Sequence, residues 1–423
     1  MRKLSSKLLL LAAGALLLLF LTNNFGLIDI QKTAIVTAIG IDAGEGGTFD
    51  VTAQIAIPDA SGANTASNVT VPGAETVGEA IAELNRKTGW FPTLVHCSLI
   101  LLGERAAEED VFRALDYFLR SEYVEDSCLV ALCADTAAAA LGAGSPIGEL
   151  ASSAIAKVLS AEAQKTGLVS VTNLRDFAKG YFAEGQSGFL PVLHAQPRAQ
   201  SEGGAGGSSE GGSEGGSSEG GSGDSSGGSS EGGSGGGASA GGQSSAGGGQ
   251  KSDVFDAAET ALFFRGRRTA ALSADETLAY NLAVSGTDMA FGDVTVFEEG
   301  AEVHYQLKMN IGKKKRRLRL EGGVPVLTFT IRAQAQAVDA DRAGSRLEIA
   351  QTAIVPDHVL RAAEQKFERE LRAAAETAHA GGCDLFSLQQ MLHRFYPKQF
   401  DALRPTLLQS VRIACDIRFA TMR

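Results

Sequence analysis

Six histidines and five cysteines are the side chains of this sequence best suited to bind a metal or to act as nucleophiles. No two histidines have the H-E-x-x-H spacing of a zinc-binding helix. His379 and Cys383 lie four residues apart, but Gly381 and Gly382 between them predict a helix end, and no third ligand accompanies them. Four cysteines lie in apolar runs and are expected to be small buried hydrophobic residues: Cys97, Cys128, Cys133 and Cys415. We therefore expect no metal, no cofactor and no disulfide framework.

Two other patterns imitate known sites but lack the context that those sites need. Asp339–Gly344 begins like an EF-hand loop, yet the twelfth position is Ala350, where a bidentate glutamate is required. Gly232–Gly236 satisfies a nucleophile-elbow pattern only because it lies in low-complexity sequence, without the strand, turn and helix that hold such a serine. Without a nucleophile, a general base or a ligand set, the chain is predicted to be a binding or scaffolding protein and not an enzyme.

A run of basic residues, Lys313–Arg317 followed by Arg319, lies at a predicted strand boundary. Such a run is typical of a solvated hairpin face, and contact with anionic lipid headgroups is the functional alternative. The formal net charge of the chain is -11, and six of the acidic residues lie between Ala199 and Gln250. The net charge of the remaining residues is therefore about -5. A nucleic-acid-binding protein would carry a basic excess, so no nucleic-acid partner is expected.

Residues 199–251 form a tract of Gly and Ser interrupted by acidic residues, without a basic, aromatic or branched aliphatic residue from Ala199 to Gln250. Such a composition cannot bury enough apolar surface to offset the entropy of ordering the backbone, so we predict a disordered linker. Together with the length of 423 residues, the linker divides the chain into folded portions at residues 29–198 and 252–423.

Residues 1–28 are predicted to be a membrane anchor or a signal segment. Arg2, Lys3 and Lys7 precede a stretch without charge that continues to Ile28, which is long enough to span a bilayer. Positive charge before the span favours export of everything downstream, so the folded portions are expected on the extracytoplasmic face. No clear A-x-A site follows the apolar core, which favours a retained anchor, and a cleaved signal peptide is the alternative. The apolar residues expected to form the anchor include Leu8, Leu11, Leu16, Leu19 and Leu21.

The portion 29–198 mixes strand and helix patterns. The β-branched run Thr33–Asp42 and the alternating run Phe49–Ile57 predict a hairpin. Thr76 is expected to cap a helix, with Glu79 completing a capping box, and a second helix is predicted over Ala106–Arg120. Further strands are predicted at Leu94–Leu102, Cys128–Cys133 and Phe189–Leu193, and further helices at Ile147–Lys165 and Asn173–Phe182.

The portion 252–423 has the same mixed character. A hairpin is predicted around Arg265–Arg267, and Ser273 with Glu276 predicts a capping box. A long helix is predicted from Pro356 to about His379. Strands are predicted at Gly292–Glu298, Glu302–Met309, Arg316–Glu321, Val326–Ala337, Arg346–Ile349 and Leu407–Phe419, and a helix at Leu385–Phe395. The predicted fold class is α+β, with two folded portions of mixed or antiparallel sheets and flanking helices, joined by the disordered linker.

Several segments, in order along the chain, resemble the Ger(x)C family, the C subunits of nutrient germinant receptors in endospore-forming bacteria. Thr33–Asp42 is similar to the A-I-V-T-A-I-G-I-D signature, and His96–Glu104 to G-H-x-x-x-I-V-I-G-E. Leu190–Pro191, Leu272–Thr277 and Phe395–Lys398 are similar to the L-P, L-D-E-E-E-T and Y-R-K-Y-P-K motifs. The motif positions carried over, with a structural role, are Ile39, Gly40, Ile41, Asp42, His96, Gly103, Pro191, Asp275, Glu276, Thr277 and Pro397.

The resemblance implies a non-enzymatic subunit anchored outside the inner membrane of the spore. It also implies assembly with integral-membrane A- and B-type receptor subunits and a part in initiating germination. Family members carry a lipidated cysteine before a Trp-Asp pair, whereas this chain has Asn24 at that position, so an uncleaved helix is expected to replace the lipid. The alternative function is a generic surface-anchored binding or adhesion module.

Overall fold

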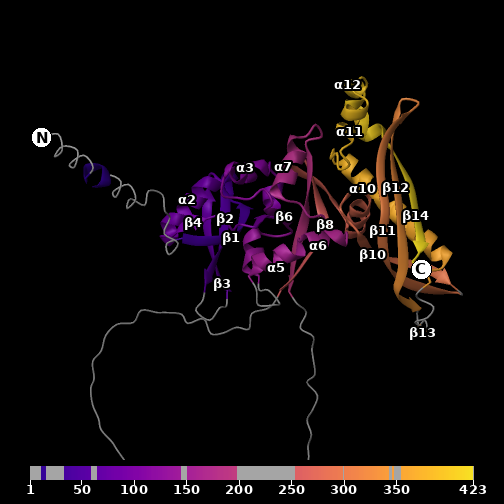
Figure 1. The fold of residues 1–423 in the computed structure, drawn as a ribbon, viewed down its shortest axis with the longest axis horizontal. Helices are drawn as coiled ribbons and strands as arrows, with labels where there is room; N and C mark the ends of the chain where they lie inside the picture. Colours follow the sequence, from indigo (N-terminus) through magenta and orange to yellow (C-terminus); the bar gives the residue numbers. More distant parts are fainter. Residues whose placement is uncertain are drawn as a thin grey trace, which may run out of the picture.

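The computed structural model describes residues 11–15, 33–58, 64–143, 150–197, 253–298, 300–342, 345–346 and 354–422. The predicted linker and all of the predicted anchor except residues 11–15 lie outside these ranges, and with them four of the five named anchor leucines. Among the described residues, no helix is both long enough and apolar enough to cross a bilayer. Figure 1 shows two sheet-containing parts that lie end to end along the long axis of the molecule.

The first sheet has nine strands in the order β3-β2-β1-β5-β6-β7-β8-β9, with β4 beside β1. Strands β1, β5, β6 and β7 are parallel to one another, and the strands at both ends of the order pair antiparallel. The strands are β1 (Thr33–Ala43), β2 (Phe49–Pro58), β3 (Asn64–Ala74), β4 (Phe91–Thr93), β5 (Leu99–Leu102), β6 (Leu129–Cys133), β7 (Ser187–Pro197), β8 (Asp253–Phe264) and β9 (Arg267–Leu272).

Helices cover both faces of the first sheet, because its central strands are apolar on both sides. In β5, Ile100 and Leu102 pack in one hydrophobic cluster, whereas Leu99 and Leu101 pack in another. The first cluster is covered by α2 (Val77–Thr88), α3 (Phe112–Arg120) and α7 (Leu174–Phe182), and the second by α4 (Ala137–Gly142) and α5 (Ala151–Val158). The shorter elements are η2 (Glu45–Gly47), η3 (Glu104–Ala107) and α6 (Ala161–Lys165).

Strands β7 and β8 are antiparallel neighbours, although residues 198–252 separate them in the sequence. Pro197, the last residue of β7, is in register with Asp253, the first residue of β8. The two described residues that flank this segment, Pro197 and Asp253, therefore lie side by side at one end of the β7–β8 pair. The chain passes from the first sheet to the second through the β8–β9 hairpin and α8 (Ala274–Val284), and the limits 29–198 and 252–423 for the two portions stay a prediction.

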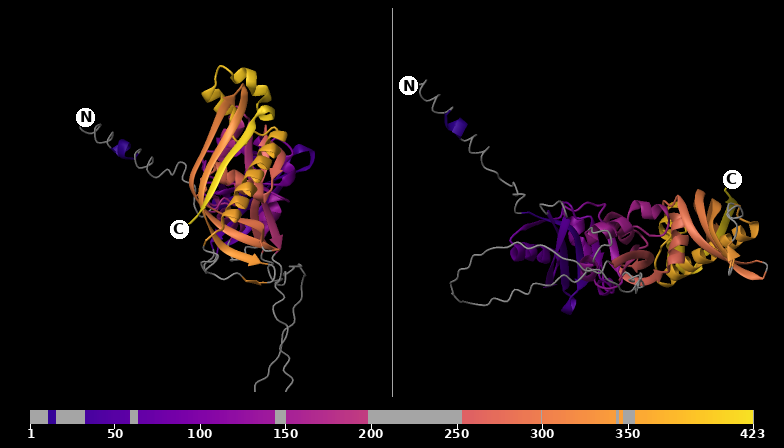
Figure 2. Two further views of the ribbon diagram at one scale, coloured as in Figure 1. Left: turned by 90° about the vertical axis from the view of Figure 1, so that its right-hand side faces the viewer. Right: turned by 90° about the horizontal axis from the view of Figure 1, so that it is seen from below.

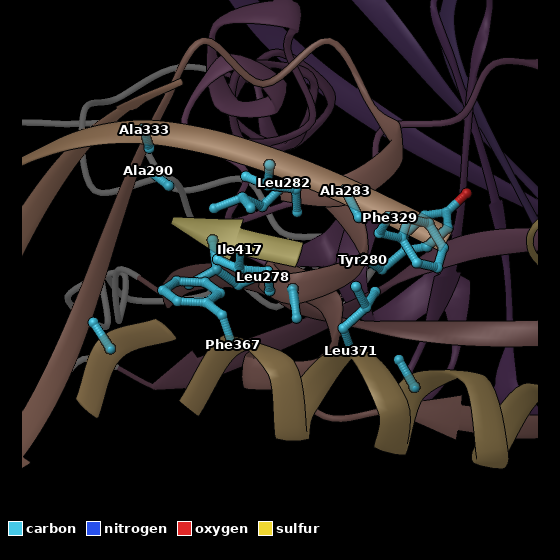
Figure 3. Packing of buried hydrophobic residues seen from close by; sticks show 14 of the residues in the cluster. Leu278, Tyr280, Leu282, Ala283, Ala290, Phe329, Ala333, Phe367, Leu371 and Ile417 are labelled. Carbon is cyan, nitrogen blue, oxygen red and sulfur yellow. The ribbon is translucent and has the colours of Figure 1, made fainter. Parts of the chain in front are cut away.

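The second sheet has the order β10-β11-β12-β13, and β14 pairs parallel with β12. Its strands are β10 (Met289–Glu298), β11 (Ala301–Glu321), β12 (Val324–Arg342), β13 (Ser345–Arg346) and β14 (Arg412–Thr421). The long helix α10 (Asp357–Ala380) runs along one face of this sheet (Figure 2). Phe367 and Leu371 of α10 point toward Leu278, Tyr280 and Ile417 in the core between α10 and the sheet (Figure 3). The predicted α+β class with two sheet-containing parts and flanking helices is confirmed.

Several predicted boundaries were wrong. The strands predicted at Glu302–Met309 and Arg316–Glu321 are one continuous strand, β11. The helix predicted from Ala106 begins at Phe112, where the Asp110 carboxylate accepts a hydrogen bond from the Phe112 N–H. Residues predicted to start the last strand form a helical turn, α13 (Leu407–Ser410), before β14. Between α10 and α13 lie α11 (Leu388–Phe395), α12 (Phe400–Leu403) and η4 (Arg404–Thr406).

The two predicted capping boxes had different outcomes. At α8 the Ser273 hydroxyl and the Glu276 carboxylate exchange hydrogen bonds with each other's backbone N–H groups, as predicted. At α2 the Thr76 hydroxyl accepts from the Glu79 N–H, but the Glu79 carboxylate accepts from the N–H of Glu75 and not from that of Thr76. The N-cap residue of each capping box could therefore be predicted from the sequence. Whether the glutamate side chain accepts from the N-cap N–H depends on the local path of the chain.

Candidate functional site

The first group of motif residues surrounds the carboxylate of Asp42 at the end of β1. One carboxylate oxygen accepts a hydrogen bond from the Ala137 N–H at 2.7 Å, and the other accepts from the Ala138 N–H at 3.0 Å. These two amides begin α4 and have no partner within that helix, so Asp42 caps it from another element. Burial raises the pKa of the Asp42 carboxyl, against the effect of these two hydrogen bonds.

Two motif glycines allow this contact. A Cβ atom on Gly103 would lie 2.0 Å from the Asp42 Oδ1 atom, and one on Gly40 would lie 3.0 Å from the Ala137 Cβ atom. Both glycines are therefore required for close approach between strand, carboxylate and helix. Ile39 and Ile41, which alternate with Gly40 and Asp42, are fully buried in the core under the first sheet. Two motifs that lie far apart in the sequence thus form one structural cluster.

The second group of motif residues lies where the two parts of the molecule join. Pro191 in β7 is in register with Thr260 in β8, and the Thr260 hydroxyl forms a 3.0 Å hydrogen bond with that of Thr277 in α8. The Glu276 carboxylate also accepts from the Thr377 hydroxyl of α10 at 3.1 Å, and Asp275 forms an ion pair with Lys366 at 3.4 Å. These contacts orient α8 between the sheets.

The remaining motif residues, His96 and Pro397, are exposed on opposite parts of the molecule. The structure thus places the motif residues in a capping cluster, a helix junction and two surface turns, and it does not bring all of them to one cavity. Within the described ranges, no group of three His, Cys, Asp or Glu side chains is arranged to hold a metal ion. Cys97, Cys128 and Cys133 are buried as predicted, whereas Cys415 is only half-buried.

The main hollow outside these clusters is a cleft between the two sheet-containing parts. One section, of about 670 Å³, lies between α7 and β7 on one side and α8 on the other, with Phe177, Phe189 and Leu385 among its apolar lining. A second section, of about 460 Å³, lies between β11 and α11. We call these the apolar hollow and the cationic hollow. They adjoin, because Arg316, Val284, Ser387 and Gln390 line both of them.

Arg316 occupies a position on β11 that faces the core. It is in register with Phe329 of β12, which is fully buried, and the next residue on the same face is the buried Leu318. Desolvation lowers the pKa of the Arg316 guanidinium, which stays charged because its ordinary value is so high. Lys314, one position earlier on this face, donates hydrogen bonds to the carbonyls of Ser285 and Thr287 at the end of α8.

Asp384 lies across the cleft from Arg316, but its oxygens have other partners. They accept hydrogen bonds from the backbone N–H groups of Leu388 at 2.6 Å and Gln389 at 2.8 Å. Asp384 thereby caps α11, where the N-cap residue Ser387 has a positive φ of 54° and makes no cap with its own side chain. Burial raises the pKa of Asp384, and these hydrogen bonds and Arg316 oppose that effect.

The cleft therefore presents positive charge beside an apolar surface, which is an arrangement able to hold an anionic group. Its residues were not among the predicted sites. The basic run Lys313–Arg317 was the available signal, but alternation along β11 divides that run between two faces. Lys314 and Arg316 face the core and the cleft, whereas Lys313 and Arg317 are exposed on the opposite face.

Two family models match the chain in sequence order. Residues 27–195 match the spore germination protein N-terminal domain, and residues 258–411 match the domain described as spore germination B3/GerAC-like, C-terminal. A solved structure described as "Crystal Structure of the GerBC protein" is similar, with 14% identity and a TM-score of 0.48, over 91% of this chain and 97% of that chain. No curated protein matches the sequence. Because the two models together match more than half of its residues, the chain belongs to the GerAC-like family of germinant receptor C subunits.

Proposed function

We propose that the chain is a membrane-anchored, non-enzymatic C subunit that assembles with integral-membrane A- and B-type subunits in a nutrient germinant receptor. In this role it resides on the outer face of the spore inner membrane and contributes to the start of germination. The observation that carries the proposal is the match of both family domains, in order, at residues 27–195 and 258–411. The non-enzymatic role rests on the family to which the chain belongs.

The position of the single tryptophan supports the anchoring part of the proposal. Trp90 and Phe91 are 49% and 44% exposed, and Phe91 is in register with Thr33 at the start of β1. Only residues 29–32 separate Thr33 from the predicted span, and an extended chain covers about 3.5 Å per residue. Strand β4 and helix α2 lie at the end of the molecule away from the second sheet (Figure 1). Exposed aromatic residues at that end suit a membrane interface.

The receptor role is tested by capture of the tagged full chain from detergent extracts of dormant spores, followed by mass spectrometry. We expect multi-spanning A- and B-type subunits to be recovered with it. A matched strain carries the same tag on an unrelated spore membrane protein as the control. Recovery of the chain only from the surface of vegetative cells, without such partners, would overturn the receptor role and favour an adhesion module.

The anchoring is tested with the full chain in vesicles, because Trp90 is the only tryptophan and reports by its own fluorescence. First, flotation with the vesicles shows whether the chain is anchored. Lipids brominated near the headgroup are then expected to quench Trp90 more strongly than lipids brominated deep in the acyl chains. A chain that fails to float contradicts the anchor itself, whereas a chain that floats with unquenched Trp90 contradicts only the proposed orientation.

A further inference from the structure

We propose that the cleft binds a small anionic ligand, with Arg316 as the residue that pairs with its phosphate or carboxylate group. This inference goes beyond the receptor role and does not depend on anchoring or on partner subunits. It assigns a ligand class to the cationic hollow and to the adjoining apolar hollow.

The first observation is that Arg316 makes no direct contact with a carboxylate of the described residues, although Asp384 across the cleft attracts its charge. Four other arginines of the second part are paired with carboxylates: Arg332 with Asp416, Arg372 with Glu368, Arg412 with Glu321 and Arg418 with Glu364. Within the described ranges, Arg316 has neither an ion pair nor a hydrogen bond, although it is half-buried and faces the core. A desolvated charge that no neighbour contacts directly is costly, and a bound anion would offset that cost.

The second observation is the charge of the cationic hollow. Its lining includes Lys314, Lys315, Arg316 and Arg394, and no Asp or Glu. Lys314 is already used by the carbonyls at the end of α8, and Arg394 lies over the Phe395 ring at 5.4 Å. Lys315 alternates with Arg316 along β11, so Arg316 is the cation that faces both the core and the cleft. The nearest acidic group in the adjoining hollow, Asp384, already accepts two backbone hydrogen bonds at the start of α11. The excess of positive charge is thus local to the cationic hollow, in a chain whose net charge is negative.

The shape and lining indicate what kind of anion fits. Each hollow is within the range of pockets that hold small molecules, which is roughly 300–1,000 Å³. A guanidinium group matches the two oxygens of a phosphate or carboxylate, so Arg316 fits that group better than an ammonium would. The adjoining apolar hollow can accept a nonpolar portion of the same ligand through Phe189 and Leu385. Ser387 and Gln390, which line both hollows, add polar groups at the point where they meet.

The test is isothermal titration calorimetry of the full chain in detergent micelles, with inorganic phosphate and with phenylacetate as probes. Chloride keeps the ionic strength constant, so general screening is the same throughout. We expect saturable binding of at least one probe, and tighter binding of phenylacetate than of acetate if the apolar hollow takes part. Vesicles containing phosphatidylglycerol form a separate arm, because saturation by vesicles alone, without binding of either small probe, would overturn the small-molecule assignment.

The decisive variant is Arg316→Gln, with Arg317→Gln as the matched control. Arg317 follows Arg316 on β11 and is exposed on the opposite face, and its replacement by Gln removes the same charge. Arg316→Gln is expected to weaken binding by at least about tenfold, and Arg317→Gln by less than about twofold. Equal weakening by both would show screening of a general basic surface and overturn the proposal, as would the absence of saturable binding to the unsubstituted chain.

A second variant, Arg316→Lys, keeps the proposal testable if Arg316→Gln fails to fold. Arg316→Lys keeps the charge but loses the fork of donors, so we expect binding between that of the unsubstituted chain and that of Arg316→Gln. Far-UV circular dichroism and thermal unfolding of all variants establish that each is folded before binding is compared. Full affinity in a folded Arg316→Lys and a folded Arg316→Gln would assign the ligand to other residues and reject the role of Arg316.

Discussion

The Asp42 cluster and the Arg316 cleft each place a charged side chain at a half-buried position of a sheet, but only Asp42 is hydrogen-bonded among the described residues. The Asp42 carboxylate accepts two backbone hydrogen bonds, and Gly103 leaves the space for it. The Arg316 guanidinium faces a hollow instead and makes no such contact among the described residues. A satisfied charge contributes to folding, whereas an unsatisfied one costs stability and is expected to serve binding.

The same difference separates the motif residues from the cleft residues. A Cβ atom on Gly103 would meet the Asp42 carboxylate, and one on Gly40 would meet Ala137, whose N–H donates to that carboxylate. A change at either glycine therefore disturbs the contact between Asp42 and α4. Arg316 borders open space, so its replacement leaves its neighbours in place. Substitutions can therefore distinguish a structural motif from a binding surface, and four predictions apply this test in order of decreasing expected effect.

The largest effect is expected for Gly103→Val. The added side chain would overlap the Asp42 Oδ1 atom and displace it from α4, so we expect a loss of about 2–4 kcal/mol in the free energy of unfolding. Urea unfolding followed by circular dichroism measures this loss. Gly142→Ala in α4 is the control, because a Cβ atom there meets nothing within 4 Å, so the change should not lower stability and can raise it by up to about 1 kcal/mol.

The next effect is expected for Asp42→Ala, which removes the cap without adding bulk. Two amides of α4 lose their acceptor, so the free energy of unfolding should fall by about 1–3 kcal/mol. Asp42→Asn keeps one acceptor oxygen and should cost less. If Asp42→Ala were as stable as the unsubstituted chain in urea, the cluster would not be the structural unit described above.

A smaller effect, dependent on pH, is expected from His379. Burial lowers its pKa to about 4, and its Nε2 atom has no hydrogen-bond partner in the described part of the chain. The unfolded chain takes up the proton first as the pH falls, so stability decreases from about pH 6.5 toward pH 4. After allowance for partial exposure, we expect about 1 kcal/mol between pH 7 and pH 5. His379→Leu should reduce this slope in unfolding curves measured at several pH values, and an unchanged slope would assign it to other groups.

The smallest effect is expected for Arg316→Gln in the absence of ligand. Because the cost of desolvating this guanidinium opposes its attraction to Asp384, its removal should change the free energy of unfolding by less than about 1 kcal/mol, in either direction. The same urea measurement applies, and Arg332→Gln, which breaks an ion pair with Asp416, provides a comparison in the same sheet. A loss as large as that of Asp42→Ala would make Arg316 a structural residue and remove the contrast between the two regions.

Local signals in the sequence predicted much of the fold. The alternation in Thr33–Asp42 and Phe49–Ile57 predicted the β1–β2 hairpin, and Ser273 with Glu276 predicted the start of α8. Pro356 and the Gly381–Gly382 pair predicted both ends of α10 within a residue or two. These features could be predicted because hydrogen bonds between near neighbours and the spacing of apolar residues act within one element.

The sequence by itself therefore determined the element types, the α+β class and the motifs that carry the family resemblance. Only the tertiary structure decided that β7 pairs with β8 across residues 198–252, that Asp42 caps α4, and that Arg316 faces a cleft between the two parts. Each of these depends on residues distant in the chain and on which face of a strand is covered. Periodicity places a residue on a face of its own strand, but packing against other elements decides what lies opposite that face.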